Sequence, residues 1–512
     1  MKKYLLLVAL LSGKYIFAQY TDEALMYSRS GVTGTARTAG SSGAFGSVGA
    51  DLGSVTVNPA GLGLYRSTDI CVTPSLVVGS NESQFDGSFK SQSSTKLSFS
   101  QAGIAFTKLF KKPGGNSDFS FNSTRVNSIS FAINYQRQAG FGRTESFDGY
   151  NTSNSGIDAY TYYANATGQP LTTDNYPVEM VLARSANLIG YDSVTGNYFS
   201  NVHSPLHQSG IVSTKGGADQ INLAFGGNVN DKFYFGIGLG IPILTYFNDA
   251  QFSESNTTDS TSGFRDYTFG SSLRSTGLAV NAQFGIIYRP VTWMRLGIAY
   301  HMPTFYSITE TYSSYMTTNF DTSYSSQSAD AYPFKYKLRT PMKGTVSASF
   351  YLKEHGFFSV DYEFQNYGAS RFNFGTDEKG FTDQVNAEEK KNFAFGHVVR
   401  AGFEGAYKTL RVRAGYAFSS TPYKKDAIVK GFAAARHNAS LGIGYRGNRF
   451  YADFAYVLGF TKDDNQPYAD FDVKNTLLSH NMLLTLGFKI SKDPAAATQK
   501  KRERSNPPPP NF

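Results

Sequence analysis

Apolar and polar residues alternate with a period of two along much of the chain. In residues 275–289, Leu278, Phe284 and Ile286 share one face, whereas Asn281 lies on the other. The same alternation is found in residues 219–230, 409–420, 449–459 and 482–490. Because successive side chains of a β-strand point to opposite faces, the pattern predicts strands with one apolar face and one face of polar or small residues.

Fourteen segments of this kind follow one another along the chain. They span residues 68–80, 95–109, 126–138, 219–230, 232–247, 273–289, 293–312, 335–352, 355–375, 396–407, 409–420, 437–446, 448–461 and 478–490. The apolar positions change from odd to even within residues 97–106, which predicts a β-bulge or an irregular strand there.

The gaps between the segments are alternately short and long. The short gaps are Asn230-Asp231, Arg289–Thr292, Lys353-Glu354, Lys408 and Gly447, and the longest gap is residues 139–218. Short turns at one end and long loops at the other are typical of a transmembrane β-barrel. The predicted fold is therefore an all-β, 14-stranded antiparallel transmembrane barrel over residues 68–490. Its even strand number places both ends in the periplasm and the 139–218 loop outside the cell.

The composition agrees with this fold class. The 512 residues include 42 Phe and 34 Tyr, and only 17% are charged. So many outward aromatic residues disfavour the alternative of a soluble β-sandwich, whose outer faces are solvated. No apolar stretch reaches the roughly 18 residues that a transmembrane helix needs.

The two ends of the chain differ from the barrel in composition. Residues 1–18 combine Lys2 and Lys3 with a short apolar run and are expected to be a signal peptide, cleaved before Gln19. Residues 491–512 are basic and then rich in proline, and they are expected to form a disordered periplasmic tail.

Charge and cysteine content exclude several functions. The formal net charge is +9, of which the leader and the tail each contribute three, so the folded part offers no basic patch for nucleic acid. Cys71 is the only cysteine, which rules out a disulfide framework or a site of several thiolates.

Residues 19–67 are rich in Gly, Ala and Ser, with nine glycines within residues 31–63. A barrel of fourteen strands leaves a wide lumen that leaks unless something fills it. This segment is available to do so, because small residues allow backbone to pack closely. We therefore expect residues 19–67 to form a plug, or hatch, inside the barrel; the alternative is a flexible linker.

Part of this segment resembles a known family. Thr35-Ala36-Arg37, Gly43-Ala44-Phe45, Ala50-Asp51 and Asn58-Pro59-Ala60-Gly61 are similar to the N-terminal signature of the FadL/TodX family. The resemblance implies a hatched barrel that transports long-chain fatty acids and other hydrophobic compounds across the outer membrane of a Gram-negative bacterium. It also implies that Asn58, Pro59, Ala60 and Gly61 form the hatch motif, and that lipid or detergent binds.

Charged residues are expected to point into the lumen on three neighbouring strands. By alternation they are Asp361, Glu363, Arg400, Glu404, Arg411 and Arg413. An arginine can bind a carboxylate through two parallel hydrogen bonds. Arg400, Arg411 and Arg413 are therefore candidates for binding the head group of an amphipathic acid. The favoured alternative is a structural ladder of salt bridges.

Motifs for other chemistry are missing or explained by strand structure. The sequence contains no Gly-x-Ser-x-Gly elbow and no phosphate-binding loop, so no enzyme and no cofactor are expected. His203 and His207 flank Pro205 in a predicted loop, and no metal site is expected there. Gly236, Gly238 and Gly240 form one strand face and are expected to leave empty space in the lumen.

Two functions remain. The first is a channel through which hydrophobic or amphipathic molecules diffuse passively past the hatch. The second is an accessory subunit of a larger outer-membrane secretion or barrel-assembly complex. In that case the 139–218 loop and the 491–512 tail would contact outer-membrane or periplasmic protein partners.

Overall fold

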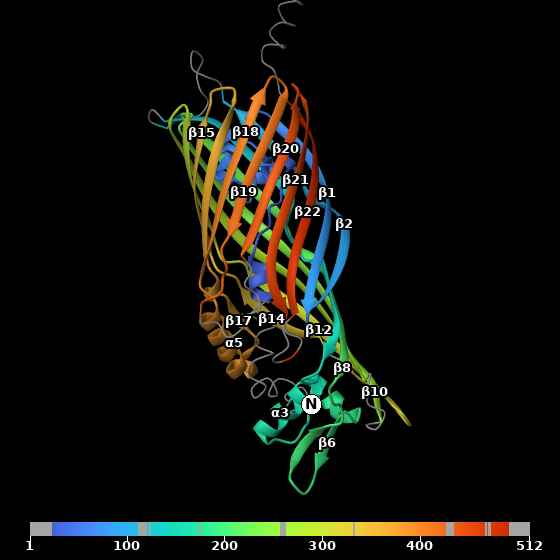
Figure 1. The fold of residues 1–512 in the computed structure, drawn as a ribbon. Helices are drawn as coiled ribbons and strands as arrows, with labels where there is room; N and C mark the ends of the chain where they lie inside the picture. The colour runs from blue at the N-terminus through green and yellow to red at the C-terminus, as the bar shows by residue number, and fades with distance from the viewer. Residues whose placement is uncertain are drawn as a thin grey trace, which may run out of the picture.

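The computed structural model describes residues 23–110, 120–121, 124–173, 176–256, 263–330, 333–425, 435–465, 468 and 473–490. The predicted signal peptide and the predicted tail lie outside the described residues. The chain forms one antiparallel sheet that closes on itself, because the first strand, β1 (Thr68–Phe85), pairs with the last, β22 (Val473–Ile490), from Thr68↔Ile490 to Gln84↔Lys474. Figure 1 shows the resulting tilted barrel.

The barrel has fourteen strands, as predicted, and most are single elements. After β1 these are β2 (Ser88–Leu109), β8 (Leu206–Val229), β9 (Phe233–Asn256), β10 (Phe264–Val291), β18 (Phe395–Tyr407), β19 (Leu410–Ser419), β20 (Arg436–Arg446), β21 (Phe450–Asn465) and β22.

The other four barrel strands are each interrupted by a few residues. They combine β4 (Thr124–Gly140) with β5 (Arg143–Asn151), β11 (Met294–His301) with β12 (Phe305–Phe320), β14 (Phe334–Arg339) with β15 (Lys343–Tyr351), and β16 (Gly356–Asn366) with β17 (Arg371–Asn373). The short β3 (Ser120–Phe121) and β13 (Tyr324–Ala329) extend hairpins at the two ends.

All five predicted tight turns lie at one end of the barrel, the short-turn end, where β1 begins and β22 ends. Asn230 and Asp231 both have φ of 54°, as a two-residue hairpin turn requires. The opposite end, the loop end, carries the long connections. They include η4 (Tyr367–Ala369), η5 (Thr376–Glu378) and α5 (Lys379–Asn392).

The predicted irregularity in residues 97–106 is confirmed as a β-bulge. Thr73 pairs with Gln101 and Pro74 with Phe99, so Ser100 has no partner residue on β1. Leu97 and Phe99 face outward before the bulge and Phe106 faces outward after it, which is the observed change of parity.

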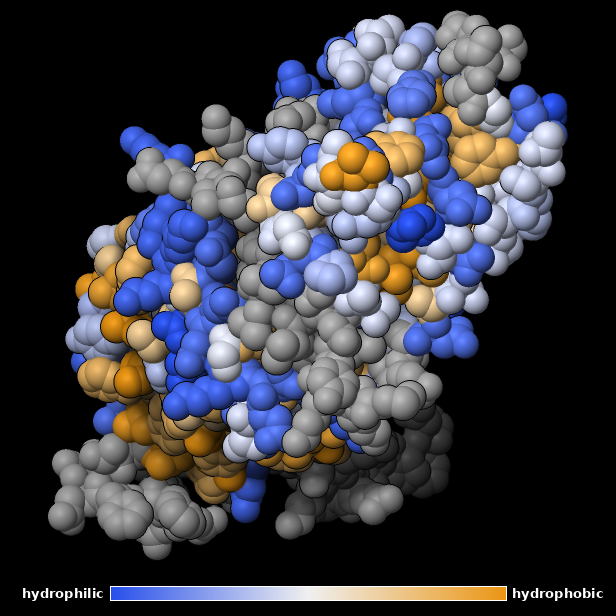
Figure 2. All heavy atoms as spheres, turned by 90° about the horizontal axis from the view of Figure 1, so that it is seen from below, coloured by the Kyte–Doolittle hydropathy of each residue, from blue (hydrophilic) through white to orange (hydrophobic). Residues whose placement is uncertain are grey.

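The outer face is apolar and the inner face is polar or small. On β10, Leu278, Val280, Phe284 and Ile286 are exposed on the outside, whereas Gln283 is buried in the interior. This is the arrangement of a barrel solvated by lipid. Seen from the loop end, hydrophobic residues gather on the flank, while the rim is mostly hydrophilic (Figure 2).

The 139–218 region is more ordered than a simple loop. Residues 143–151 form β5, and residues 206–218 belong to β8, so the connection that leaves the barrel is residues 152–205. It folds into α3 (Gly156–Thr167), α4 (Val178–Ser185) and the hairpin of β6 (Ile189–Asp192) and β7 (Asn197–Ser200). This subdomain packs on the extended ends of β8, β10 and β12 through an apolar cluster that includes Ile157, Leu188 and Tyr267.

The topology leads to a labelling prediction. Val194 is 92% exposed at the tip of the β6–β7 hairpin, and Lys353 is exposed at the short-turn end. The native Cys71 is buried, so it adds no background. On intact cells, a membrane-impermeant maleimide should label Val194→Cys and leave Lys353→Cys unlabelled. Labelling of Lys353→Cys but not of Val194→Cys would show that the barrel has the opposite orientation in the membrane.

Candidate functional site

The N-terminal residues 23–67 lie inside the barrel, where Figure 1 shows them in dark blue. They contain a helical turn at residues 23–28, α2 (Ala36–Ala39), η2 (Leu52–Ser54) and η3 (Pro59–Leu64), and most of their side chains are buried. The described part of the predicted hatch therefore fills the lumen.

The Asn-Pro-Ala-Gly motif forms the cap of η3. The Asn58 Oδ1 accepts a hydrogen bond from Ala60 N at 3.0 Å, and Pro59 supplies the fixed φ that starts the helix. The Asn58 Nδ2 donates to Gly46 O at 2.7 Å and to Ile298 O of β11 at 3.4 Å. One fully buried side chain thus joins two parts of the hatch to the barrel wall.

Glycines in the wall make room for the hatch. A Cβ at Gly236 would overlap the Pro59 carbonyl, and one at Gly285 would overlap Asn58 Oδ1. A Cβ at Gly226 would lie 2.6 Å from Leu62 Cβ. The expectation that Gly236 leaves empty space in the lumen is therefore wrong, because the hatch backbone occupies that space.

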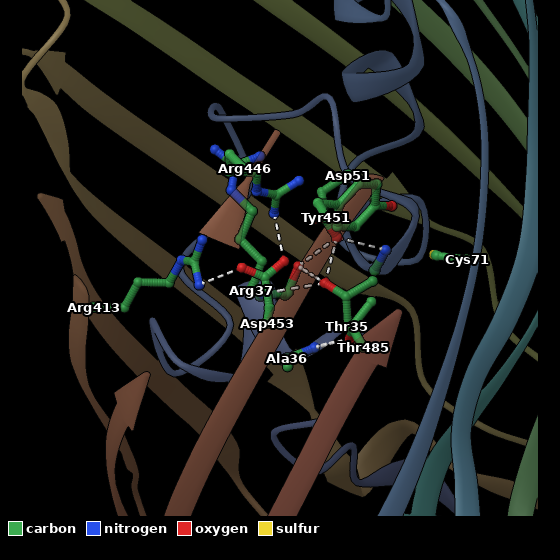
Figure 3. Close-up of polar contacts among 12 residues, drawn as sticks. Thr35, Ala36, Arg37, Asp51, Cys71, Arg413, Arg446, Tyr451, Asp453 and Thr485 are labelled. Carbon is green, nitrogen blue, oxygen red and sulfur yellow. Dashed lines mark hydrogen bonds and ion pairs between the residues drawn. The ribbon is translucent and has the colours of Figure 1, made fainter. Parts of the chain in front are cut away.

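A chain of buried ion pairs connects the hatch to β18–β21. Arg37 of α2 contacts Glu404 at 2.8 Å, and Glu404 also contacts Arg413 at 2.6 Å. Arg413 and Arg446 then share Asp453, at 2.8 Å and 2.7 Å. Figure 3 shows Arg413 and Arg446 pointing toward Asp453 from either side.

A second set of contacts surrounds Asp51, which lies next to this chain in Figure 3. The Asp51 Oδ1 accepts hydrogen bonds from Thr35 Oγ1 at 2.6 Å and Thr38 Oγ1 at 3.0 Å, which fixes α2 against η2. The Ala36 N donates to Thr485 Oγ1 of β22 at 2.7 Å. Hatch and wall are therefore joined by directional polar contacts on several sides.

The three arginines proposed from the sequence do not form one open site. Arg413 belongs to the chain of ion pairs, and Arg400 contacts Glu363 at 3.1 Å. Arg411 donates to the carbonyls of Lys408 and Leu410 at the turn, at 2.7 and 2.8 Å. Their head-group role stays a prediction, and these contacts favour the structural alternative.

A cavity of about 540 Å³ lies in the lumen on the loop side of this network. Its apolar lining includes Leu25, Met26, Phe141, Tyr246 and Leu273, and its charged lining is Glu23, Arg29, Arg143, Glu145, Arg436 and Asp463. Arg143 is paired with Glu145 and with Asp463. Within the described residues, the Arg436 side chain makes no hydrogen bond or ion pair, so its guanidinium is available to a ligand.

The cavity adjoins a chamber of aromatic residues. Tyr27, in the first turn of the hatch, is surrounded by Phe141, Tyr246 and Tyr306, with ring centroids at 6.0, 6.3 and 6.5 Å. The cluster continues through Tyr336 to Phe374 and its neighbours near the loop end. Aromatic side chains of the hatch and the wall therefore provide an apolar environment next to the available guanidinium.

The barrel wall is incompletely hydrogen-bonded beside the cavity. β2 pairs with β4 from Leu109↔Ser128 to Gln101↔Gln136. Beyond that point the described residues show β2 paired only with β1, and β5 paired only with β8. Side-chain hydrogen bonds cross this line instead: Lys90 Nζ donates to Asp148 Oδ2 at 3.4 Å and Gln92 Nε2 to Ser146 Oγ at 3.0 Å. Lys96 Nζ donates to Gly216 O of β8 at 3.1 Å. We call this line between residues 88–100 and 141–151 the seam.

Comparisons with known proteins agree with this architecture. No protein-family model and no curated protein matches the sequence. Among solved structures, a Pseudomonas aeruginosa FadL homologue matches over 90% of this chain and 99% of its own, with a TM-score of 0.52 and 12% identity. The P. putida toluene transporter TodX matches over 91% and 99%, with a TM-score of 0.50 and 9% identity. The chain has the FadL/TodX fold.

The described part of the chain shows neither a metal site nor a membrane-spanning helix. The described residues contain no group of three His, Cys, Asp or Glu side chains placed to hold a metal ion. None of the helices in the described part of the chain is long and apolar enough to cross a bilayer. His207 instead contacts Asp148 at 3.0 Å, and His203 lies before β8.

Within this FadL/TodX fold, sequence reasoning missed Arg436 and Tyr27. Arg436 precedes the predicted strand 437–446 by one residue. It shares the inward face of that strand with Asn438 and Ser440, so the alternation extended by one residue would have found it. Tyr27 gave no such signal, because a single helical turn shows no periodicity.

The wall glycines provide a matched test of the hatch. Gly236 and Gly238 face the same way on β9, but a Cβ at Gly238 has no neighbour closer than 3.6 Å. Gly236→Ala should displace the Pro59–Ala60 turn, at an overpacking cost of about 1–3 kcal/mol, and raise conductance in planar bilayers. Gly238→Ala should conduct like the wild type. Wild-type conductance in both variants would contradict a close-packed hatch.

Proposed function

We propose that the protein lies in the outer membrane of a Gram-negative bacterium and conducts hydrophobic or amphipathic small molecules by passive diffusion. The cavity carries this proposal, because its wall combines apolar side chains such as Leu25, Phe141 and Leu273 with polar and charged groups, among them the Arg436 guanidinium. The fold supports it, since solved structures with this fold include a transporter of toluene. Apolar surface together with polar groups that fix the orientation of a ligand is typical of a small-molecule site.

The route begins at the loop end and passes through the cavity. On the side of the cavity that faces the short-turn end, the ion pairs and the close-packed glycines block the lumen. The seam is the nearest part of the wall, and Ser94, Ala139 and Gly142 beside it line the cavity. An apolar ligand can leave through the seam once the side-chain hydrogen bonds of Lys90, Gln92 and Lys96 are broken, without disrupting a backbone ladder.

The head group of an amphipathic acid binds Arg436 in this proposal. Arg400 and Arg413 already bind carboxylates of the protein, whereas Arg436 faces the cavity beside Arg29 and Arg143. A carboxylate that enters the cavity gains a charge-assisted hydrogen bond and offsets the repulsion among these cations. The alkyl chain then lies along the apolar wall.

A pair of ligands tests the role of Arg436. Arg436→Gln should weaken the binding of a long-chain fatty acid about 10- to 100-fold, because a hydrogen bond to a charged group contributes about 1.5–3 kcal/mol. Binding of the alcohol with the same chain should not change. Both affinities are measured by calorimetry on the purified protein in detergent.

Arg411→Gln is the matched control, since that guanidinium donates to turn carbonyls outside the cavity. It should leave both affinities at the wild-type value. Equal losses for acid and alcohol in Arg436→Gln would show a structural effect and contradict the head-group site.

One observation favours the second candidate function, a subunit of a larger complex. The 152–205 subdomain exposes Tyr162 (79%) and Val194 (92%), together with Phe199, and such side chains can contact a protein partner. Purification in mild detergent separates the two functions. A monomer that carries lipid supports the channel, whereas stoichiometric protein partners support the complex.

A further inference from the structure

Three tyrosine–histidine pairs repeat on the outer face of the barrel. The Tyr362 hydroxyl lies 2.8 Å from His397 Nδ1, between β16 and β18. The equivalent distance is 2.6 Å for Tyr416 and His437, between β19 and β20. It is 2.7 Å for Tyr456 and His480, between β21 and β22.

The three pairs share one geometry. In each, the tyrosine lies two residues before the residue opposite the histidine, as the register pairs His397↔Phe364, His437↔Phe418 and His480↔Leu458 show. The same contact has therefore formed at three separate strand pairs.

The pairs also lie at one height on the barrel. Phe418 of β19 pairs with Val399 of β18 and with His437 of β20, so His437 is in register with Val399. Val399 lies two residues from His397 toward the short-turn end. Phe460 of β21 pairs with His437 and with Leu478, so Leu478 is in register with His437. His480 lies two residues from Leu478 toward the short-turn end. Strands tilted by about 35–45° need a stagger of about two residues over two strands to keep side chains level. Figure 1 shows β18–β22 leaning in the same direction.

This height is the loop-side edge of the apolar belt. From His397 toward the short-turn end, β18 presents Val399, Phe403 and Tyr407 on the outside. Residues 397–407 of a tilted strand rise about 25 Å, which is the height of the lipid-facing band of such barrels. The pairs are therefore level with the lipid head groups.

The pairs direct hydrogen-bond donors outward. The tyrosine hydroxyl is a better donor than a neutral imidazole, so it donates to Nδ1 and leaves the imidazole proton on Nε2. Within the described residues, Nε2 of His397, His437 and His480 has no hydrogen-bond partner. Each pair thus presents one fixed N–H at the head-group level.

A row of cations lies further toward the loop end: Tyr362 pairs with Val346, and the row is between seven and eleven residues before Val346. Lys335, Lys337 and Arg339 are exposed on β14, while Tyr336 and Leu338 between them face the lumen cluster. β14 pairs with β17, which follows β16 toward the loop end, so the row is further from the apolar belt than Tyr362. In the described structure, these three cations form no ion pair.

We propose that the three Tyr–His pairs and the cations of β14 form a docking surface for the phosphate groups of lipids at the loop-side edge of the barrel. The donors at the edge bind phosphate oxygens, and the cations beyond it bind the remaining negative charge. Figure 2, which looks at the loop end, shows mostly hydrophilic residues on the rim and hydrophobic residues on the flank.

Lipid selectivity tests the proposal. The full-length protein is reconstituted in phosphatidylcholine vesicles that carry a trace of spin-labelled phosphatidic acid or spin-labelled phosphatidylcholine. Electron paramagnetic resonance then gives the ratio of their association constants from the immobilised lipid. The wild type should prefer phosphatidic acid, and Lys335→Gln/Lys337→Gln/Arg339→Gln should lower the preference by about fivefold or more. His397→Gln/His437→Gln/His480→Gln should also lower it.

The matched control removes three exposed cations at the short-turn end, as Lys232→Gln/Lys353→Gln/Lys408→Gln. It should keep the wild-type preference, and heat-modifiable migration should show that every variant is folded. Equal loss in this control, or no preference in the wild type, would overturn the proposal. An unchanged preference in the histidine variant would overturn the role of the Tyr–His pairs.

Discussion

Closure of the β-sheet is the constraint on which the rest of the structure depends. In a bilayer, every backbone polar group needs a partner within the protein, and the ladder between β1 and β22 removes the last free edge. A closed sheet of fourteen strands has an outer face that must be apolar and a lumen too wide for side chains alone to fill. The lumen therefore needs a separate filling segment, and residues 23–67 supply it.

Two kinds of contact hold residues 23–67 in the lumen, and each kind is found in a different part of it. On the side of β18–β22 the hatch is fixed by the ion pair between Arg37 and Glu404 and by the hydrogen bond from Ala36 N to Thr485 Oγ1. On another side, Asn58 Nδ2 donates to Ile298 O of β11. On the loop side its first turn is held mainly by the packing of Tyr27 against aromatic residues. The cavity lies on this second side, where apolar contacts replace directional ones. The cavity therefore lies in the part of the lumen where a ligand can compete with the protein's own side chains.

The period of two was sufficient to predict the strands within the belt, because lipid on one side and polar lumen on the other enforce it. It placed all fourteen strands, and the change of parity in residues 97–106 located the bulge at Ser100. It failed where that contrast ends: β8, β9 and β10 extend past the belt, where both faces meet water or the 152–205 subdomain. The alternation also could not predict the role of Gly236, because a glycine that accommodates another segment has the same sequence pattern as one that leaves a void.

The difference between the two kinds of contact determines which part of the hatch can yield to a ligand. Removal of Arg37 from Glu404 would break a buried ion pair and leave Glu404 with Arg413 as its partner, at a cost of up to about 3–5 kcal/mol. Withdrawal of Tyr27 exposes mainly the rings of Phe141, Tyr246 and Tyr306, and a hydrophobic molecule that enters the chamber covers that surface again. The exchange of Tyr27 for a ligand is therefore close to balanced, whereas displacement of α2 is strongly unfavourable. If the proposed channel function holds, we expect a hydrophobic ligand to displace the first turn of the hatch, while the ion pairs hold the remainder in place and prevent a continuous aqueous pore.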